Sequence, residues 1–376
     1  MNSHYLGAAL ELARQGLGRT SPNPAVGAIL VRDGEIVGRG FHTWTGSRHA
    51  EIVALDDAGE RARGATLYIN LEPCSHQGRT GPCAEALVRA GVARVVAIHQ
   101  DPNPLVAGRG FALLRQGGVE VGIDPSLATE AEALNRPFFH FMRTGRPLVT
   151  LKSALTLDGK IAAPEDNSGW ITSEKARAHV QQMRHLHDAI MTGIGTVLAD
   201  DCLLTDRSGL ERSRPLLRIV LDSQLRLPLQ SRMVESCRGD VLAVCTSVAP
   251  ATRRKLLEER GVEVLVADQP GGQTDMHAVV QALAARKVLS LMIEAGSKVN
   301  WAALVGGVAD RIYYYYAPKI RGGLLALPVA GGIGRRRRVD AIRLRDLSLH
   351  LISPDEFAVE ATVVRAQPDA APEPRA

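Results

Sequence analysis

Two short stretches decide how the first half of the chain folds: His49-Ala50-Glu51, and Pro73-Cys74-Ser75-His76-Gln77-Gly78-Arg79-Thr80-Gly81-Pro82-Cys83. The first stretch opens a run with helical spacing over residues 50–62. The second follows a strand-like run, 66–71, and its last cysteine leads into a helical run over residues 84–90. Because strands alternate with helices here, the sequence predicts an α/β layer with a mostly parallel sheet.

His49, Cys74 and Cys83 are residue types that bind zinc, and each lies at the end of a predicted element. One imidazole and two thiolates leave the fourth position of a tetrahedral zinc ion open to water, which is typical of a catalytic site. Zinc acidifies such a water, and Glu51 can take its proton and deliver it to a leaving amine. The alternatives are a structural zinc site or no metal, since an isolated His-x-Glu occurs by chance in many chains.

The composition is that of an ordinary globular protein, and its length predicts two domains. The chain has 376 residues, of which 45% are apolar and 23% charged, so extensive disorder is excluded. No apolar run reaches the roughly 18 residues that cross a bilayer, and the N-terminus lacks the uninterrupted apolar core of a signal peptide. Five cysteines in such a chain do not make a disulfide scaffold. We therefore expect a cytoplasmic protein without membrane partners.

Positive charge is concentrated in the second half of the chain. Residues 1–145 carry 14 Arg and 14 acidic residues, residues 146–366 carry 30 Lys and Arg against 24 acidic residues, and residues 367–376 have a net charge of −1. This distribution fits phosphorylated small molecules at least as well as nucleic acid. The run Arg335-Arg336-Arg337-Arg338 lacks interleaved aromatic residues, so we interpret it as a solvated loop.

The helical pattern stops near residues 143–147, which predicts domains at 1–145 and 146–366 and a disordered tail at 367–376. The second domain has no Gly-x-Gly-x-x-Gly, so an ordinary dinucleotide-binding fingerprint is excluded. Instead, Glu294-Ala295-Gly296-Ser297-Lys298 lies between a strand-like run and a helical run. Free N–H groups at such a turn can meet a phosphate, and a plain strand–helix connection is the alternative.

Several motifs resemble those of the bacterial bifunctional deaminase/reductase family of riboflavin biosynthesis. His-x-Glu followed by Pro-Cys is shared by nucleobase deaminases in general, whereas the eight residues between Cys74 and Cys83 resemble this family. Ser21 and Gly81 depart from the family's His and Pro. The matching stretches are residues 21–27, 73–83, 101–104 and 108–110 in the first half, and 151–160, 168–173 and 195–201 in the second.

The resemblance implies an α/β protein with an N-terminal cytidine-deaminase-like three-layer domain and a C-terminal dihydrofolate-reductase-like domain. The first domain would use zinc, bound by His49, Cys74 and Cys83, to deaminate 2,5-diamino-6-ribosylamino-4(3H)-pyrimidinone 5′-phosphate, with Glu51 as the catalytic acid/base. The side-chain types suit a heterocycle and a phosphate, although Asn and Asp beside proline are also ordinary turn residues. The implied substrate contacts are Asn23, His42, His76, Arg79, Asp101 and Asn103.

The second domain would use NADPH to reduce the ribose of 5-amino-6-(5-phosphoribosylamino)uracil to a ribityl chain. Lys152 would orient the ribose, and Glu294 would assist proton delivery. Cys202 replaces a proline of the family, and Asp206 adds a negative charge beside Arg207. The implied cofactor contacts are Ala154, Trp170, Thr196, Ser223, Gly296, Ser297, Lys298, Val299, Asn300, Trp301 and Ala302, and the implied substrate contacts are Ser168, Arg184, Asp200, Leu204, Arg207 and Glu294.

The partners implied are small phosphorylated pyrimidines and a second copy of the chain, bound through the reductase domain. Two other classes of function remain as alternatives. An RNA-associated base deaminase would need cations beside the zinc site, which the neutral first domain does not supply. A metal-stabilised module without activity would bind zinc and release neither ammonia nor NADP⁺.

Overall fold

The structure, a computed structural model, describes residues 2–75, 81–162 and 169–365. The chain divides into two compact units: residues 1–146 with 211–214, and residues 147–210 with 215–376. The sequence predicts a boundary beside residue 146, whereas nothing in it indicates that residues 211–214 belong with the first unit. The predicted disordered tail at 367–376 lies outside the described residues, as do three candidate substrate contacts, His76, Arg79 and Ser168.

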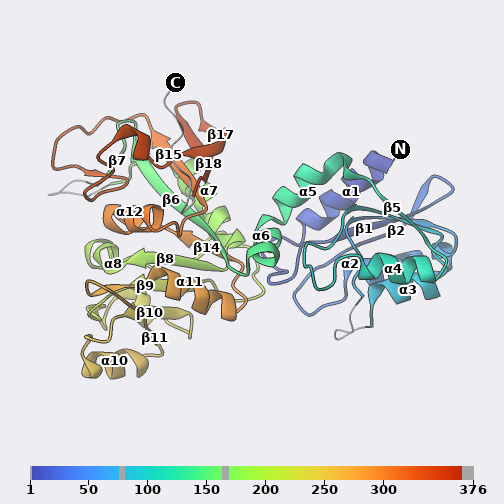
Figure 1. Ribbon diagram of the computed structural model, residues 1–376, viewed down its shortest axis with the longest axis horizontal. Helices are drawn as coiled ribbons and strands as arrows, with labels where there is room; N and C mark the ends of the chain where they lie inside the picture. The colour runs from blue at the N-terminus through green and yellow to red at the C-terminus, as the bar shows by residue number, and fades with distance from the viewer. Residues whose placement is uncertain (1, 76–80, 163–168, 366–376) are drawn as a thin grey trace. The chain divides into compact units, whose positions relative to one another are not determined.

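A five-stranded sheet in the order β2-β1-β3-β4-β5 organises the first unit (Figure 1). Strands β3, β4 and β5 are parallel, but β1 is antiparallel to both β2 and β3. Parallel pairing thus holds for β3 to β5, whereas β1 and β2 form a hairpin, which the Asp33-Gly34 sequence itself favours and whose two turn residues both have positive φ. The elements are α1 (Asn2–Arg14), β1 (Gly27–Arg32), β2 (Glu35–Phe41), α2 (Ala50–Ala58), η1 (Gly59–Ala62), β3 (Thr66–Leu71), α3 (Cys83–Arg89), β4 (Arg94–His99), α4 (Arg109–Gln116), β5 (Glu120–Ile123), η2 (Pro125–Leu127), α5 (Ala128–Leu134) and α6 (Arg136–Thr144).

Helices cover both faces of this sheet, which gives the three layers that the family resemblance implies (Figure 1). On one face, α1 and α5 pack against the sheet around Leu6, Leu10 and Ile98. On the other face, α2, α3 and α4 enclose a core that includes Leu87 and Leu114. A sheet buried on both faces explains why the strands read as nearly continuous apolar runs.

Two glycines of β2 allow α2 to lie unusually close to the sheet. A Cβ atom at Gly40 would lie 2.2 Å from the carbonyl oxygen of Ala50, and one at Gly38 would lie 2.3 Å from that of Ala54. Any larger residue would force the helix away from the strand. This contact fixes the start of α2, and therefore the position of His49 directly before it.

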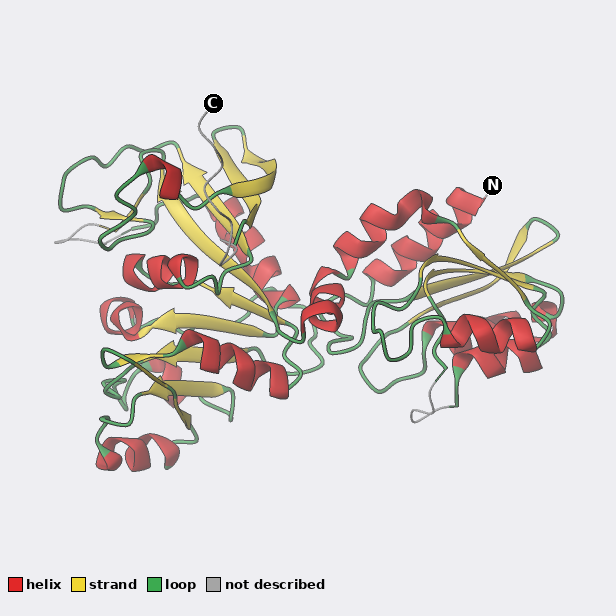
Figure 2. Ribbon diagram, in the orientation of Figure 1, coloured by secondary structure: helices red, strands yellow, loops and turns green. Residues whose placement is uncertain are grey.

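A nine-stranded sheet in the order β11-β10-β9-β8-β14-β6-β15-β18-β17 organises the second unit (Figure 2). Counted in this sheet order, all strands from β11 through β15 are parallel. Strand β18 is antiparallel to β15, and β17 is antiparallel to β18. Among the described residues, no helix has the length and apolar character needed to cross a membrane. The elements are β6 (Leu148–Thr156), β7 (Lys160–Ala162), α7 (Glu174–Leu186), β8 (Ala189–Gly193), α8 (Ile194–Asp200), β9 (Leu217–Leu221), α9 (Arg232–Glu235), β10 (Val241–Cys245), α10 (Ala251–Glu258), β11 (Glu263–Val266), β12 (Asp268–Gln269), β13 (Gln273–Thr274), α11 (Met276–Ala285), β14 (Ser290–Ile293), α12 (Ser297–Val305), β15 (Arg311–Ala317), β16 (Leu327–Pro328), η3 (Arg338–Asp340), β17 (Leu344–Ser353) and β18 (Glu356–Val363).

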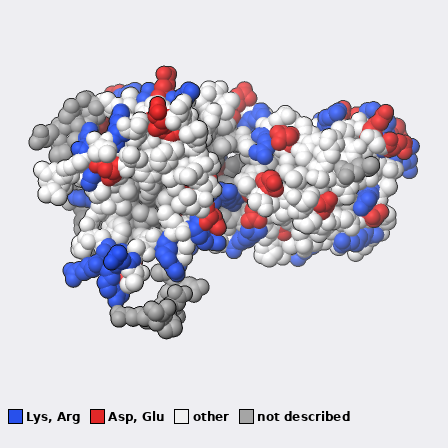
Figure 3. Space-filling view, turned by 90° about the horizontal axis from the view of Figure 1, so that it is seen from above, with Lys and Arg blue, Asp and Glu red and all other residues white. Residues whose placement is uncertain are grey.

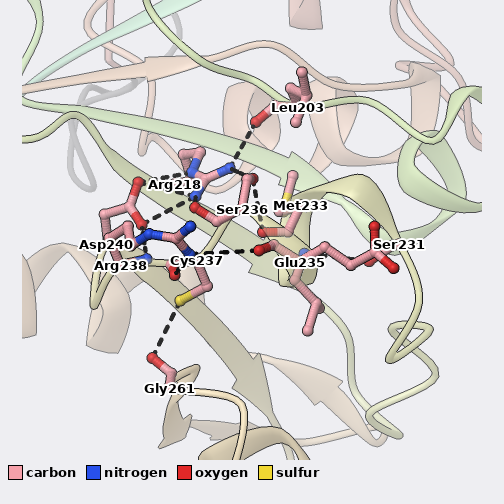
Figure 4. A network of polar contacts seen from close by, with 11 residues as sticks. Leu203, Arg218, Ser231, Met233, Glu235, Ser236, Cys237, Arg238, Asp240 and Gly261 are labelled. Atoms are coloured by element: carbon pink, nitrogen blue, oxygen red, sulfur yellow. Dashed lines mark hydrogen bonds and ion pairs between the residues drawn. The ribbon is translucent and has the colours of Figure 1, made fainter.

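Arg218, in β9, is the centre of a buried polar network (Figure 4). Its side chain is 1% exposed and forms two hydrogen bonds with the carboxylate of Asp240, at 3.0 and 2.9 Å. It also donates to the Ser236 hydroxyl at 2.9 Å and to the carbonyl oxygen of Leu203 at 3.1 Å. The network therefore ties the loop that follows α8 to the middle of the sheet.

Replacing Arg218 should destabilise the second unit strongly. Arg218→Ala removes the partner of the Asp240 carboxylate, of the Ser236 hydroxyl and of the Leu203 carbonyl oxygen. The free energy of unfolding should therefore fall by about 3–5 kcal/mol. Urea unfolding followed by circular dichroism measures this loss. Arg337→Ala, which removes an exposed arginine paired with Asp340, is the control and should unfold like the parent. A loss below about 1 kcal/mol for Arg218→Ala would contradict this view of the network.

Candidate active sites

Three side chains of the first unit converge on a space the size of a metal ion. His49 precedes α2, Cys74 follows β3, and Cys83 is the first residue of α3. The Nδ1 atom of His49 lies 3.5 Å from the Sγ atom of Cys74 and 3.3 Å from that of Cys83. All three ligand atoms lie within 4.8 Å of one another.

These distances fit zinc. Bonds of about 2.3 Å to sulfur and 2.0–2.1 Å to nitrogen separate the nitrogen and sulfur ligands of a tetrahedral ion by about 3.5 Å. The backbone N–H of Cys83 points at the Cys74 sulfur at 3.4 Å, which supports a thiolate there. Hydrogen bonding to the Cys83 side chain lowers the pKa of Cys74. The donor set and its spacing therefore suit a zinc ion with one position left for a small molecule.

Glu51 lies beside this centre, in the first turn of α2. Its side chain is buried, and burial raises its pKa to about 7. A carboxyl group held this close to neutrality can both accept and release a proton. The sequence predicts this role for Glu51, and the structure places it where the role is possible.

His42 lies beside the metal ligand His49, and Asn23 lies beside His42. The Asn23 amide nitrogen is 3.4 Å from Nε2 of His42, and the rings of His42 and His49 meet edge to face with centroids 5.4 Å apart. Burial lowers the pKa of His42, which favours its neutral form. Asn23 precedes β1 and His42 follows β2, so these two candidate substrate residues come from the same, open end of the β1–β2 hairpin, where Gly27 pairs with Phe41.

Asp101 and Asn103 occupy the loop between β4 and α4, where their side chains support tight turns. The carboxylate of Asp101 accepts the N–H of Asn103 at 2.8 Å, and the side-chain oxygen of Asn103 accepts the N–H of Leu105 at 3.1 Å. The turn interpretation of these residues is therefore correct. It leaves their role toward substrate as a prediction, because a loop ordered in this way also presents its side chains in fixed directions.

The second unit contains a group of three charged side chains, of which Lys152 and Arg184 are buried and Glu294 is half-buried. Lys152 Nζ lies 3.1 Å from one oxygen of Glu294, and Arg184 Nη2 lies 2.9 Å from the other. Burial opposes ionisation of Glu294, but the adjacent lysine and arginine outweigh it and lower its pKa to about 2. Proton delivery by Glu294 stays a prediction, and in this arrangement each oxygen of its carboxylate is bound by a cation.

The candidate cofactor residues lie near the carboxyl ends of parallel strands. Residues 296–302 span the turn after β14 and the N-terminal part of α12, and Thr196 lies in the first turn of α8, directly after β8. Asn300, fully buried, donates to the Ser153 hydroxyl of β6 at 3.1 Å. Since β6, β14, β8 and β9 are consecutive in the sheet, these residues share the edge where α/β proteins bind nucleotides. Trp170 is 67% exposed and stacks with Arg177.

The remaining candidate substrate residues lie in and after α8. Asp200 ends that helix, and burial raises its pKa. Leu204 is buried with a positive φ of 51°, whereas the side chain of Arg207 is exposed. Asp206 does not simply add charge beside Arg207, because it forms a buried pair with His185 at 3.1 Å. Burial raises the pKa of Cys202 to about 11, so its thiol is neutral.

Known proteins resemble the chain along nearly its whole length. Residues 1–99 match the family model of the cytidine and deoxycytidylate deaminase zinc-binding region, and residues 147–356 match that of the RibD C-terminal domain. The riboflavin biosynthesis protein RibD of Actinobacillus pleuropneumoniae is 43% identical over 93% of both chains, and that of Escherichia coli is 41% identical over 94% of this chain and 97% of the other.

Solved structures give the same result. The structure of Acinetobacter baumannii RibD covers 97% of this chain and 99% of its own with a TM-score of 0.88 at 37% identity. A diaminohydroxyphosphoribosylaminopyrimidine deaminase/5-amino-6-(5-phosphoribosylamino)uracil reductase from Thermotoga maritima covers 96% of this chain and 99% of its own, with a TM-score of 0.82 at 34% identity. The fold class expected from the sequence is confirmed.

Removing one sulfur should empty the metal centre. Cys74→Ala leaves two ligands, so the zinc content of purified protein should fall from about one per chain to near zero. Elemental analysis measures this, and Cys237→Ala is the matched control because the Cys237 thiol contacts only the carbonyl oxygen of Gly261 among the hydrogen bonds described. Full zinc content in Cys74→Ala would show that the metal binds elsewhere.

Proposed function

The chain belongs to the RibD family, the bifunctional deaminases and reductases of riboflavin biosynthesis, and we propose how its own residues carry out the two reactions. The first unit hydrolyses the amine of 2,5-diamino-6-ribosylamino-4(3H)-pyrimidinone 5′-phosphate. The second unit reduces the ribose of the resulting 5-amino-6-(5-phosphoribosylamino)uracil. The observation that carries the first assignment is the convergence of His49, Cys74 and Cys83 beside buried Glu51.

In deamination, zinc bound by His49, Cys74 and Cys83 supplies a Lewis acid that makes water nucleophilic near neutral pH. Glu51 accepts the proton of the attacking water and returns it to the leaving amine, so that ammonia departs as a neutral molecule. Asn23 pairs with the edge of the pyrimidine through its amide. His42, neutral because it is buried, contributes a hydrogen bond without adding charge beside the metal.

In reduction, residues 296–302 and Thr196 would hold NADPH, which would supply the hydride for C1′ of the ribose. The protein aligns the sugar with this donor. Glu294 holds the ammonium of Lys152 at a fixed place, where it can donate a hydrogen bond to a ribose oxygen as the ring opens. The ring of Tyr315, whose centroid is 5.8 Å from Nζ, supports the same position.

The phosphate of the second substrate is better suited to Arg207 than to Arg184. The guanidinium of Arg184 binds Glu294 and the carbonyl oxygen of Thr205, so its main role is to hold this carboxylate and the loop that follows α8. Arg207 is exposed at the end of that loop and can form a two-point contact with a phosphate.

The partners we propose are these phosphorylated pyrimidines and a second copy of the chain. On the face of the described residues drawn in Figure 3, basic and acidic side chains alternate over most of the surface and basic side chains gather in one small cluster at the lower left, which is less than a continuous nucleic-acid track needs. A zinc site with free thiolates and a need for NADPH both fit a reducing compartment, so we place the protein in the cytoplasm.

The contact between copies is proposed for β17, the last strand of the nine-stranded sheet. Leu347, Leu349 and Leu351 share one face of this strand and are 60%, 69% and 77% exposed. An edge strand with an exposed apolar face is usually covered by another chain. A partner at this strand would be consistent with assembly through the reductase domain.

Glu51→Gln should separate metal binding from catalysis. The amide cannot accept a proton, so ammonia release should fall by about 10²–10⁴-fold while zinc content is kept. Ammonia and NADPH absorbance are followed separately, and the deaminated uracil is also supplied directly. NADPH oxidation with that uracil should equal the parent's, which controls for folding. Substantial ammonia release by Glu51→Gln would remove Glu51 from its role, and a parent inactive in both assays would refute the function.

Leu349→Glu should prevent self-association. The parent is expected to sediment as an oligomer and the variant as a monomer, because a charge would be buried at the contact. Sedimentation velocity at several concentrations measures this. Val248→Glu changes another apolar residue, 73% exposed and distant from β17 along the sheet, and should leave the association unchanged. A monomeric parent would contradict the proposed contact.

A further inference from the structure

A buried carboxylate, Glu72, lies one residue beyond β3 and is 6% exposed. The described hydrogen bonds of its side chain are all with backbone N–H groups, two in the loop between β4 and α4 and one in the first turn of α4. One oxygen accepts the N–H of Asp101 at 3.1 Å and that of Gly108 at 2.9 Å, and the other accepts the N–H of Phe111 at 3.1 Å. A single side chain therefore binds the beginning and the end of this loop and the first turn of the helix that follows it.

The loop gathered by Glu72 carries two candidate substrate contacts, Asp101 and Asn103. Their side chains support turns inside the loop, but these turns span only two residues each and do not attach the loop to the sheet. Among the hydrogen bonds described, the side chain of Glu72 attaches both ends of the loop to the end of β3. Since a buried carboxylate is strongly stabilised by several N–H donors and costly to leave without them, the loop and the carboxylate hold each other in one arrangement.

The same side chain is close to the metal ligands along the chain. Glu72 is separated from Cys74 only by Pro73. Helix α4 packs tightly against Pro73. A Cβ atom at Gly110 would lie 1.9 Å from the carbonyl oxygen of Pro73 and 3.1 Å from Glu72 itself. The loop that carries Asn103 is thus fixed relative to the segment that carries a zinc ligand.

Asn70, two residues earlier in β3, provides a similar contact for the other substrate loop. Its amide accepts the N–H of Gly27 at 2.9 Å and donates to the carbonyl oxygen of Ala25 at 3.0 Å. The side chain of Asn135 adds two more hydrogen bonds to the backbone of Ala25, both at 2.8 Å. The end of β3 therefore anchors both loops through main-chain contacts.

We propose that Glu72 is a positioning residue for deamination: it holds the loop of Asp101 and Asn103 at the distance from the metal ligands at which the pyrimidine substrate binds. This inference rests on the proposed function. Glu72 does not touch the reacting atoms and acts through the loop, so its loss should weaken substrate binding more than the chemical step.

Glu72→Gln tests the role with little change in size. Glutamine has one acceptor oxygen and a donor NH₂ group, so at least one backbone N–H of the loop loses its acceptor. KM for the pyrimidine in ammonia release should rise about 10-fold or more, while kcat changes less than KM. Zinc content and the reduction of supplied uracil should equal the parent's. Glu120→Gln, the same change at an exposed residue of β5, should leave all of these values unchanged.

A second variant shows whether the effect passes through the loop. If Glu72 acts by placing Asn103, then Asn103→Ala and Glu72→Gln should not combine multiplicatively, and KM of the double variant should be close to that of the worse single variant. Hydrogen exchange should also be faster at the amides of Gly108 and Phe111 in Glu72→Gln. Neither result is expected from a general loss of stability.

Three outcomes would overturn the proposal: an unchanged KM, a loss of zinc in parallel with activity, or fully multiplicative effects of the two substitutions. A parent that releases no ammonia from the pyrimidine would refute the proposed function instead. In that case hydrogen exchange alone tests whether Glu72 anchors the loop. The anchoring would be refuted if the amides of Gly108 and Phe111 exchanged no faster in Glu72→Gln than in the parent.

Discussion

Compensation of buried charge governs both reaction centres. In the first unit, two thiols and an imidazole lie within 4.8 Å of one another, and two thiolates at that separation repel unless a cation lies between them. In the second unit, the carboxylate of Glu294 is tolerated because Lys152 and Arg184 each bind one of its oxygens. Each centre is therefore ordered by the charge that it must neutralise, and side chains near it have few other arrangements.

Close backbone packing gives these centres their rigidity. Gly38 and Gly40 bring α2 against β2, and Gly110 brings α4 against Pro73. The functional side chains are then placed by the ends of strands and helices, whose positions vary little, rather than by long side chains. A residue at such an end can be held within the small tolerance that proton and hydride transfer require.

How far the sequence predicts this molecule depends on how local each signal is. The zinc ligands and Glu51 are predicted because each lies at the end of an element recognisable from its own residues. Glu72 is missed because its partners are backbone amides 29 to 39 residues away, which leave no pattern of side chains. The pairing of Asp206 with His185 is missed because the two side chains lie 21 residues apart in the sequence. Strands β17 and β18 escape notice because the leucines of β17 face outward, so the usual relation of apolar pattern to core is lost.

The assignment of residues 211–214 to the first unit has a consequence for how this gene could be divided. Arg214, within that segment, donates to the hydroxyl of Ser21 at 3.0 Å, two residues from Asn23. A cut after residue 146 would produce a deaminase fragment with Ser21 but without Arg214. The reductase fragment would contain Arg214 without Ser21. Separate expression of the two activities would thus break the hydrogen bond between Arg214 and Ser21, whereas a single polypeptide keeps both residues together.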